Sequence, residues 1–186
     1  MSINGSGIRD IARVLQVGTN TVISTLKKKT LITPVNPAYL KRRKKRVKVC
    51  IKRAEVDEFW SFVGSKKQQR WTWYTIDQDT GQIIAFVLGP RTDDTFKKLL
   101  RLLKRAGIRV KQWFCEEWGA YRRCLPARKL FIGKENTWQI ECKNLDFRTR
   151  IKRLQRRTLC FSKKVAMHDT IIGLFINIVF FNCKLI

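Results

Sequence analysis

Three acidic residues stand at positions from which they could hold metal ions together. Asp57 lies in a segment that alternates charged and apolar residues, Glu116 directly follows an apolar run, and Glu141 lies near the start of a later helical segment. Carboxylate oxygens suit Mg²⁺, and two Mg²⁺ ions about 3.5–4 Å apart can bind the attacking and leaving oxygens of a phosphodiester. We therefore expect two Mg²⁺ or Mn²⁺ ions that are bridged by Asp57, with Glu116 as a further ligand of one ion and Glu141 as a further ligand of the other.

The other acids have plainer explanations. Glu55 and Glu58 flank Asp57 and are expected to point outward from a strand and pair with the abundant bases, whereas Asp77 and Asp79 are expected to form a turn. The same interpretation, a surface acid that balances nearby bases, stays open for each of the three candidates. Their value as a metal site depends on whether the fold brings them together.

The charge of the chain indicates a polyanionic partner. Of its 186 residues, 40 are Lys or Arg and only 14 are Asp or Glu, which gives a formal net charge of +26. The bases lie in several separate clusters rather than along one amphipathic helix, so nucleic acid is favoured over an anionic membrane. Hydrophobic residues make up 44% of the sequence, which means that a folded domain displays this charge.

Hydrophobic periodicity predicts strands and helices in a defined order. Three strands are followed by a helix, a fourth strand that ends at the position of Glu116, a short helix, a fifth strand and a long helix. This order predicts a mixed α/β sheet with an antiparallel edge, compatible with the ribonuclease H-like fold, in which the first and fourth strands can be neighbours. The expected strands are residues 54–64, 70–77, 82–89, 108–115 and 129–133, and the expected long helices are residues 91–107 and 137–157.

The first 33 residues are expected to form a small helix-turn-helix. Ile8, Ile11, Ala12 and Leu15 share one face of the first helix, which ends before Gly18. In such a motif the second helix enters the major groove of DNA, although a plain helical hairpin is the alternative interpretation. The residues expected to meet base edges are Asn20, Thr21, Ser24 and Thr25, and those expected on phosphates are Lys27, Lys28 and Lys29.

Residues 34–52 are expected to form a basic linker between this head and a catalytic domain of residues 53–186. Pro34 and Pro37 are expected to end helical structure, and seven of the eight residues from 41 to 48 are basic. Clustered like charges repel one another and usually need an anionic partner, although a solvated charge cluster is the alternative. The expected phosphate contacts are Arg42, Arg43, Lys44 and Lys45.

The cysteines and the apolar C-terminal stretch indicate where in the cell the protein is expected to be. Six cysteines occur without a C-x-x-C pair, so we expect reduced thiols and no zinc site. No secretory signal pattern stands at the start, and the apolar residues 171–186, interrupted by Asn177 and Asn182, are too few for a bilayer span. We expect a buried closing helix there, and a cytoplasmic, nucleoid-associated protein without a membrane partner.

Several ordered blocks of the sequence resemble one bacterial family. The blocks are "AEVDEFWSFVGSKKQQRWTWYTID", "EEWGAY", "IGKENTWQIECKNLDFRTRIKRLQRRTLCFSK" and "MHDTIIGLFIN", preceded by "GSGIRDIARVLQVGTNTVISTLKKK". Together they are similar to the transposases of the insertion-sequence-one family, and the first stretch resembles the helix-turn-helix of that family. The resemblance covers nearly the whole chain, from Gly5 to about Asn177.

The resemblance implies a ribonuclease H-like core with an Asp-Asp-Glu triad. It further implies Mg²⁺-dependent cleavage at the inverted-repeat ends of an insertion element and transfer of the freed 3′-hydroxyl to target double-stranded DNA by a homo-oligomer. Asp57 matches the first acid and Glu141 the third. His168 falls in a matching block, either as a catalytic residue or as part of the closing helix. Positions that match a DNA-gripping stretch after the third acid are Arg148, Arg150, Lys152 and Arg153.

The sequence departs from the family pattern in ways that indicate a divergent or truncated copy. Where the family usually has an Asp, this chain has Cys115-Glu116-Glu117-Trp118, so that Glu116 or Glu117 would be the second acid, one methylene longer. Cys142 stands where an Arg commonly follows the catalytic Glu. The N-terminal zinc ribbon of the family has no counterpart, and the sequence ends in "FFNCKLI".

Two functional hypotheses follow, and a third stays open beside them. The chain is either a metal-dependent DNA transposase or a catalytically impaired relative that acts only as a DNA-binding protein. A general basic nucleic-acid-binding protein would explain the net charge but gives no reason for acids at the ends of apolar strands.

Overall fold

The computed structural model describes residues 1–27, 32–41, 49–133, 137–155 and 158–183, which form two compact units. The first, called here the sheet unit, comprises residues 34–60 and 70–144. The second, the helical unit, comprises residues 1–33, 61–69 and 145–186. Residues 34–41, expected to lie in a linker, are thus part of the sheet unit, where the bridge between Val35 and Ala85 attaches them to the sheet.

A five-stranded mixed sheet organises the described part of the chain. Its order is β3-β2-β1-β4-β5. β2 and β3 form an antiparallel hairpin, whereas β4 runs parallel both to β1 and to β5. The expectation that the first and fourth strands are neighbours is therefore confirmed, and the architecture is ribonuclease H-like. The strands are β1 (Val49–Val63), β2 (Ser65–Asp77), β3 (Gln82–Gly89), β4 (Ile108–Cys115) and β5 (Leu130–Ile132).

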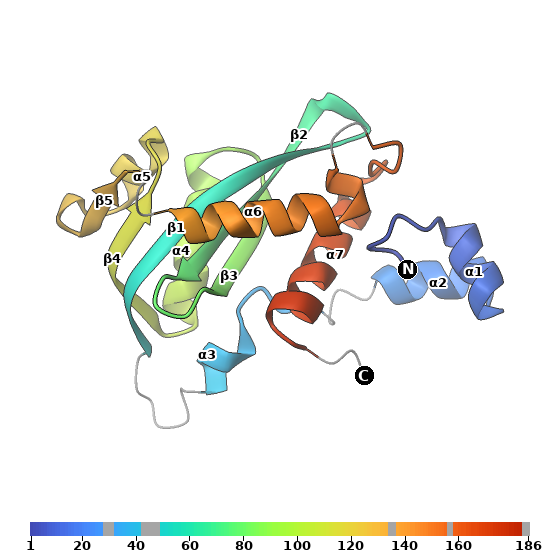
Figure 1. Ribbon diagram of the computed structural model, residues 1–186, viewed down its shortest axis with the longest axis horizontal. Coiled ribbons are helices and arrows are strands. Elements are labelled where there is room, and N and C mark those ends of the chain that lie inside the picture. The colour runs from blue at the N-terminus through green and yellow to red at the C-terminus, as the bar shows by residue number, and fades with distance from the viewer. Residues whose placement is uncertain (28–31, 42–48, 134–136, 156–157, 184–186) are drawn as a thin grey trace. The chain divides into compact units, whose positions relative to one another are not determined.

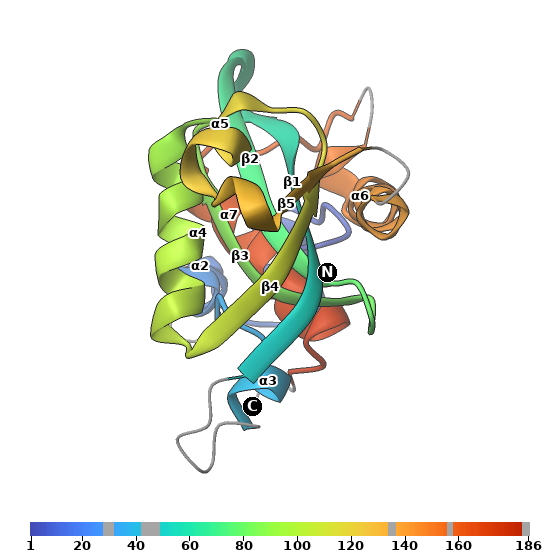
Figure 2. The same cartoon turned by 90° about the vertical axis from the view of Figure 1, so that its left-hand side faces the viewer.

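Helices cover both faces of this sheet (Figures 1 and 2). α4 (Asp93–Arg105) connects β3 to β4 and packs on one face, with α5 (Gly119–Cys124) beside it. The first turns of α6 (Trp138–Arg150) lie on the opposite face. Thr92 caps α4, because its side chain accepts a hydrogen bond from the Thr95 amide. A short helix, α3 (Pro37–Lys41), precedes the sheet.

Aromatic rings fill the core between the sheet and α4. Trp73 on β2 is fully buried and contacts the rings of Phe96, Trp118 and Tyr121. Phe96 comes from α4, whereas Trp118 and Tyr121 come from the segment that follows β4. Because these rings meet on Trp73, the core fixes the segment after β4 against the sheet.

A buried charge network lies beside this aromatic cluster. Glu58 on β1 is 7% exposed and pairs with Arg91, whose guanidinium lies 2.6 Å from its Oε1. The Tyr121 hydroxyl donates a hydrogen bond to the other oxygen of Glu58. The Arg91 guanidinium also lies over the rings of Trp71 and Trp118, at 4.7 and 4.9 Å from their centroids. Glu58 is therefore not the outward-pointing surface acid that the strand pattern predicts.

The helical unit begins with two short helices, α1 (Ile8–Leu15) and α2 (Thr19–Lys27). Ile11, Ala12 and Val22 form the buried contact between them. Leu15 lies on the same face of α1 but is 56% exposed, because it stands at the C-terminal end of the helix, directly before the left-handed Gln16. The two helices and their turn otherwise follow the predicted pattern.

The C-terminal part of the helical unit is built around α7 (Val165–Phe175) and the π-helical turn Ile176–Phe180. Asn177 is buried and holds residue 33, since its side chain accepts from the Thr33 amide and donates to the Thr33 carbonyl. Buried His168 bonds through its two ring nitrogens to Ser61 and Ser162, each at 3.0 Å. Among the described residues, no helix is long and apolar enough to cross a membrane.

The boundaries of several elements differ from the sequence pattern. β1 begins at Val49, five residues earlier than expected, because residues 49–55 pair with β4. Pro37 begins α3 rather than ending a helix. Proline suits this position, because the amide groups of the first turn of a helix have no partner within the helix, so the missing N–H costs nothing. α6 ends at Arg150, whereas the sequence predicted a helix that continued to residue 157.

We predict that Arg91→Ala destabilises the protein far more than loss of an exposed ion pair does. The substitution takes one partner from the buried Glu58 carboxylate, which keeps the hydrogen bond from the Tyr121 hydroxyl; because the Arg91 side chain is itself 43% exposed, the cost is about 1–3 kcal/mol. The matched control is Arg122→Ala, since Arg122 and Glu117 form an ion pair in which both side chains are mostly exposed, and its loss costs less than about 1 kcal/mol. Urea unfolding measures both; equal costs would contradict the role of the Glu58 network.

Candidate active site

Asp57 and Glu116 lie at the same level of two neighbouring parallel strands, Asp57 in the middle of β1 and Glu116 directly after the last residue of β4. The register of β1 and β4 pairs Glu55 with Phe114. Asp57 is two residues beyond the first of these, and Glu116 is two residues beyond the second, so both stand at the same level of the sheet. The two carboxylates also repel one another, because Glu116 contributes to the raised pKa of Asp57.

Asp57 sits in an environment that disfavours its negative charge. Burial raises its pKa from 3.8 to about 7, and the neighbouring carboxylates of Glu58 and Glu116 add to the increase. A hydrogen bond opposes the shift, since the Asn144 amide nitrogen donates to Asp57 Oδ2 at 2.9 Å. The site therefore combines desolvation with like charges, a pattern typical of functional carboxylates.

The N-terminal end of α6 is bonded to the face of the sheet that carries the side chains of Glu55 and Asp57. Glu55, fully buried, accepts a hydrogen bond through Oε2 from the Ile140 amide at 3.0 Å. The Tyr74 hydroxyl on β2 lies 3.1 Å from the Ile140 carbonyl and 2.8 Å from Asn144 Oδ1. Burial raises the pKa of Glu55, and the bond from Ile140 partly offsets this. Glu55 thus binds a helix start and is not the outward-pointing strand acid that was expected.

Glu141 lies on the first turn of α6 and is exposed. The helix that carries it is the helix that contacts Asp57, but the contact is made by Asn144. Across the described residues, the structure assembles no group of three or more His, Cys, Asp or Glu side chains that could hold a metal ion. The fold brings two of the three predicted acids together and places the third on the adjoining helix.

The two consecutive glutamates after β4 have different surroundings. Glu116 is half-buried next to Asp57, whereas Glu117 is exposed and forms an ion pair with Arg122 at 3.1 Å. Trp118 follows and packs into the aromatic core, so the turn between the strand and the core is short. This arrangement supports Glu116, rather than Glu117, as the acid that accompanies Asp57.

The chemistry of the donor set fits a divalent cation. Asp57 and Glu116 offer hard carboxylate oxygens on adjacent strands, and a cation between them would favour the ionised form of Asp57, whose pKa is raised by burial first and by the charges of Glu58 and Glu116 in addition. The adjacent thiol does not compete, because burial raises the pKa of Cys115 to about 12 and keeps the sulfur protonated. These two acids could hold one ion, with Glu141 as the nearest further carboxylate of the predicted triad.

The residues expected to bind DNA fall into three groups. The first group lies on α2 and is exposed, as a base-reading helix requires: Asn20, Thr21, Ser24, Thr25 and Lys27. The Ser24 hydroxyl also donates a hydrogen bond to the Thr21 carbonyl. Arg150 and Lys152 are exposed, and Arg148 and Arg153 are half-buried. Lys28, Lys29, Arg42, Arg43, Lys44 and Lys45 lie outside the described residues.

Sequence reasoning missed the polar residues that support the acids. Asn144 and Tyr74 lie in segments whose fold was predicted, yet neither residue type is unusual in a helix or a strand. One available signal for Asn144 was its spacing, three residues after Glu141, which places both on neighbouring sides of one helix. Arg91 carried no signal, because its role depends on two tryptophans 20 and 27 residues away in sequence.

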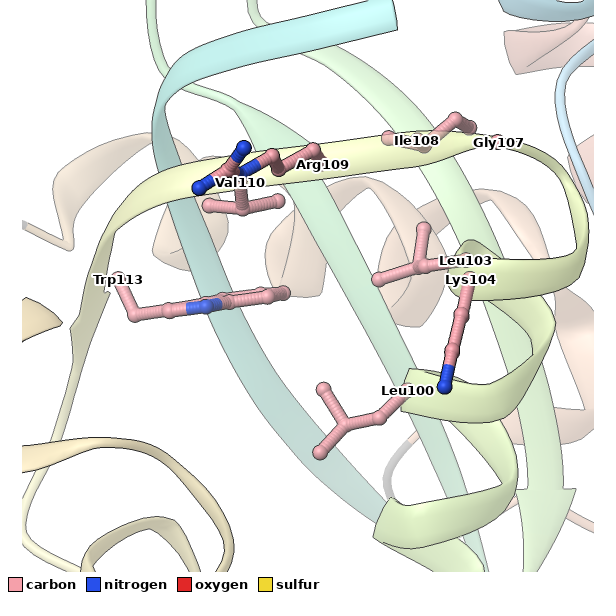
Figure 3. Close-up of a pocket in the computed structure, with 8 residues that line it drawn as sticks. All are labelled: Leu100, Leu103, Lys104, Gly107, Ile108, Arg109, Val110 and Trp113. Atoms are coloured by element: carbon pink, nitrogen blue, oxygen red, sulfur yellow. The ribbon is translucent and has the colours of Figure 1, made fainter. Parts of the chain in front are cut away.

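An apolar pocket in the sheet unit is separate from these acids. Figure 3 shows it between α4 and β4, with Leu100 and Leu103 facing Val110 and Trp113. Its volume is about 290 Å³. It lies towards the beginning of β4, near Gly107, whereas Glu116 follows the other end of that strand.

Comparison with known proteins assigns both parts of the chain to one family. The profile described as IS1 transposase matches residues 47–182, and the profile described as InsA C-terminal domain, a helix-turn-helix, matches residues 1–30. The first match contains Asp57, Glu116 and Glu141.

Individual relatives agree with these profiles. The chain is 48% identical over 123 residues to the insertion element iso-IS1n protein InsB of Shigella dysenteriae, covering 66% of this chain and 92% of that protein. It is 40% identical over 125 residues to the insertion element IS1 protein InsB of Shigella flexneri, covering 67% and 94%. It is 38% identical over 125 residues to the insertion element IS1 9 protein InsB of Escherichia coli (strain K12), covering 67% and 74%. Since the transposase profile spans most of the sequence, including both acid-bearing strands and α6, the chain belongs to the IS1 transposase family.

Proposed function

We propose that this chain is a DNA transposase that cuts and joins DNA at the ends of an insertion element by metal-dependent phosphoryl transfer. The observation that carries the proposal is that Asp57 in the middle of β1 and Glu116 directly after β4 stand at the same level of two adjacent parallel strands, with α6, which bears Glu141, attached to β1 beside them. Membership of the IS1 transposase family supports the same reaction class. The substrate would be double-stranded DNA with the inverted repeats of the element.

Each acid would have a distinct part in this reaction. Asp57, on the central strand, would bridge two Mg²⁺ or Mn²⁺ ions, while Glu116 and Glu141 would each hold one of them. Bound ions of this kind stabilise the attacking and leaving oxygens of a phosphodiester. The sheet would supply a rigid base for this site, and β1, β4 and α6 would hold the three acids around the bond to be cut.

The remainder of the chain would bind and orient DNA. The helix-turn-helix places exposed polar side chains on α2, and the net charge of +26 favours contact with phosphates. The basic side chains after Glu141, from Arg148 to Arg153, would hold DNA near the cut. A homo-oligomer would be needed to bring two element ends together.

Asp57→Ala is expected to abolish nicking of a DNA fragment that ends in the inverted repeat of the element, in Mg²⁺ or Mn²⁺. It should leave DNA binding in a gel-shift assay unchanged, because Asp57 is not part of the helix-turn-helix. Asp94→Asn is the control, since Asp94 is an exposed acid at the start of α4. If the wild type and Asp57→Ala nick equally little while both bind, the chain acts only as a DNA-binding relative.

Glu116→Asp is expected to raise metal-dependent nicking above the wild-type level. The family usually has an Asp after the fourth strand, and the extra methylene of Glu moves the carboxylate by roughly 1.5 Å. Misplacement on this scale can cost on the order of 100-fold in rate. Single-turnover nicking measures the change, with Glu117→Asp as the matched control. No gain, or a loss, would mean that Glu116 is not a misfitted ligand.

The raised pKa of Asp57 predicts a pH-dependent effect of Asp57→Asn on stability in the absence of divalent ions. The folded state holds the Asp57 proton up to about pH 7, whereas the unfolded chain releases it near pH 4. This group therefore lowers stability as pH rises from about 4 to about 7. Asp57→Asn should be more stable than the wild type at pH 8, by a difference that shrinks towards pH 4. Thermal unfolding in EDTA tests this, and a difference independent of pH would contradict it.

A further inference from the structure

We propose that Asn144, oriented by Tyr74, is a positioning residue that holds the Asp57 carboxylate and fixes the register of α6 on the sheet. The inference rests on the proposed metal site and concerns residues that act on it through Asp57. Neither Asn144 nor Tyr74 would touch the ions or the DNA. Their contribution would be to present the bridging carboxylate, and the helix that carries Glu141, in one defined arrangement.

The hydrogen bonds determine which way the Asn144 amide faces. The Asn144 amide nitrogen donates to Asp57 Oδ2 at 2.9 Å, which suits the ionised carboxylate that a metal site needs, because that form can only accept. The amide oxygen then faces Tyr74, whose hydroxyl donates to it at 2.8 Å. Tyr74 is fully buried, and its hydroxyl also meets a second acceptor, the Ile140 carbonyl on the same helix, at the longer distance of 3.1 Å. Tyr74, Asn144 and Asp57 therefore form a directed chain of hydrogen bonds in which each side chain orients the next.

Two residues of α6 are bonded to two residues of β1, and the spacing of each pair along its own element is nearly the same. Glu55 holds the Ile140 amide, and Asp57 holds Asn144. Two residues of a strand span about 6.6 Å, and four residues of a helix span about 6 Å. The two spacings agree closely enough for both contacts to form at once. A slide of α6 by one residue, or a rotation about its axis, would break both.

This attachment decides where Glu141 can go. Glu141 lies three residues before Asn144, which places it about 60° around the helix and about 4.5 Å along it. With α6 held at Ile140 and Asn144, only the side-chain torsions of Glu141 are free to bring its carboxylate towards the two strand acids. Asn144 thus acts on the first acid directly and on the third through the helix.

The test measures Mn²⁺ binding to the full chain without DNA, by the loss of the free-ion signal in electron paramagnetic resonance. Asn144→Ala is expected to weaken Mn²⁺ affinity by about tenfold, as loss of a residue that orients a metal ligand does. Tyr74→Phe is expected to weaken it less, because Asn144 remains. In the Asn144→Ala background, Tyr74→Phe should weaken affinity less than it does alone, since only its bond to the Ile140 carbonyl is then left to lose.

Gln139→Ala is the matched control for these variants. Gln139 also lies on α6 and donates a hydrogen bond to the Gln78 carbonyl, but this bond does not involve Asp57. Thermal unfolding of each variant without metal separates lost affinity from lost folding. If Asn144→Ala binds Mn²⁺ no more weakly than Gln139→Ala, the positioning role is wrong. If the two losses from Tyr74→Phe and Asn144→Ala simply add, the role of Tyr74 is wrong.

One more variant separates this inference from the proposed function on which it rests. Asp57→Ala should abolish the Mn²⁺ binding that the wild type shows. Should Asp57→Ala bind as tightly as the wild type, the metal site itself is wrong. Should Asp57→Ala lose binding while Asn144→Ala behaves like Gln139→Ala, the metal site stands and the positioning inference alone fails.

Discussion

Three carboxylates in the middle of the central strand impose the main constraint on this structure. Glu55, Asp57 and Glu58 lie within four residues of β1, and burial raises the pKa of each. A carboxylate in such a place destabilises the fold unless another group donates to it. Each of the three has a different partner: the start of α6 for Glu55, Asn144 for Asp57, and Arg91 with Tyr121 for Glu58.

Meeting this constraint also builds the surroundings of the candidate site. Successive residues of a strand face opposite sides of the sheet, so Glu55 and Asp57 draw α6 onto one face while Glu58 draws Arg91 and the segment after β4 onto the other. The second group of contacts holds Trp118 and, through the short turn before it, Glu116. The first group holds the helix that carries Glu141. The hydrogen bonds that stabilise the buried carboxylates of β1 therefore also hold the segments that carry Glu116 and Glu141.

Sequence patterns were sufficient for the order of the main strands and helices, because that order depends on local periodicity and residue type. The pairing of β1 with β4 was compatible with the element order but not required by it, and the sheet of the structure is what places Asp57 and Glu116 at the same level. The partners of the acids could not be predicted, because a strand pattern says which residues share a face but not what covers that face. Glu55 and Glu58 illustrate this: as charged residues in a basic chain they indicated an exposed surface, and only the tertiary contacts reveal them as buried.

The thiol of Cys115 carries a consequence for the chemical durability of this region. It is the last residue of β4, fully buried and adjacent in sequence to Glu116, where the nearby carboxylates and the apolar core both oppose a thiolate. Oxidants and alkylating agents react with thiolates far faster than with protonated thiols. Burial above all, and the nearby carboxylates to a smaller extent, disfavour the thiolate, so Cys115 is expected to react with such agents more slowly than the exposed Cys50 and Cys142.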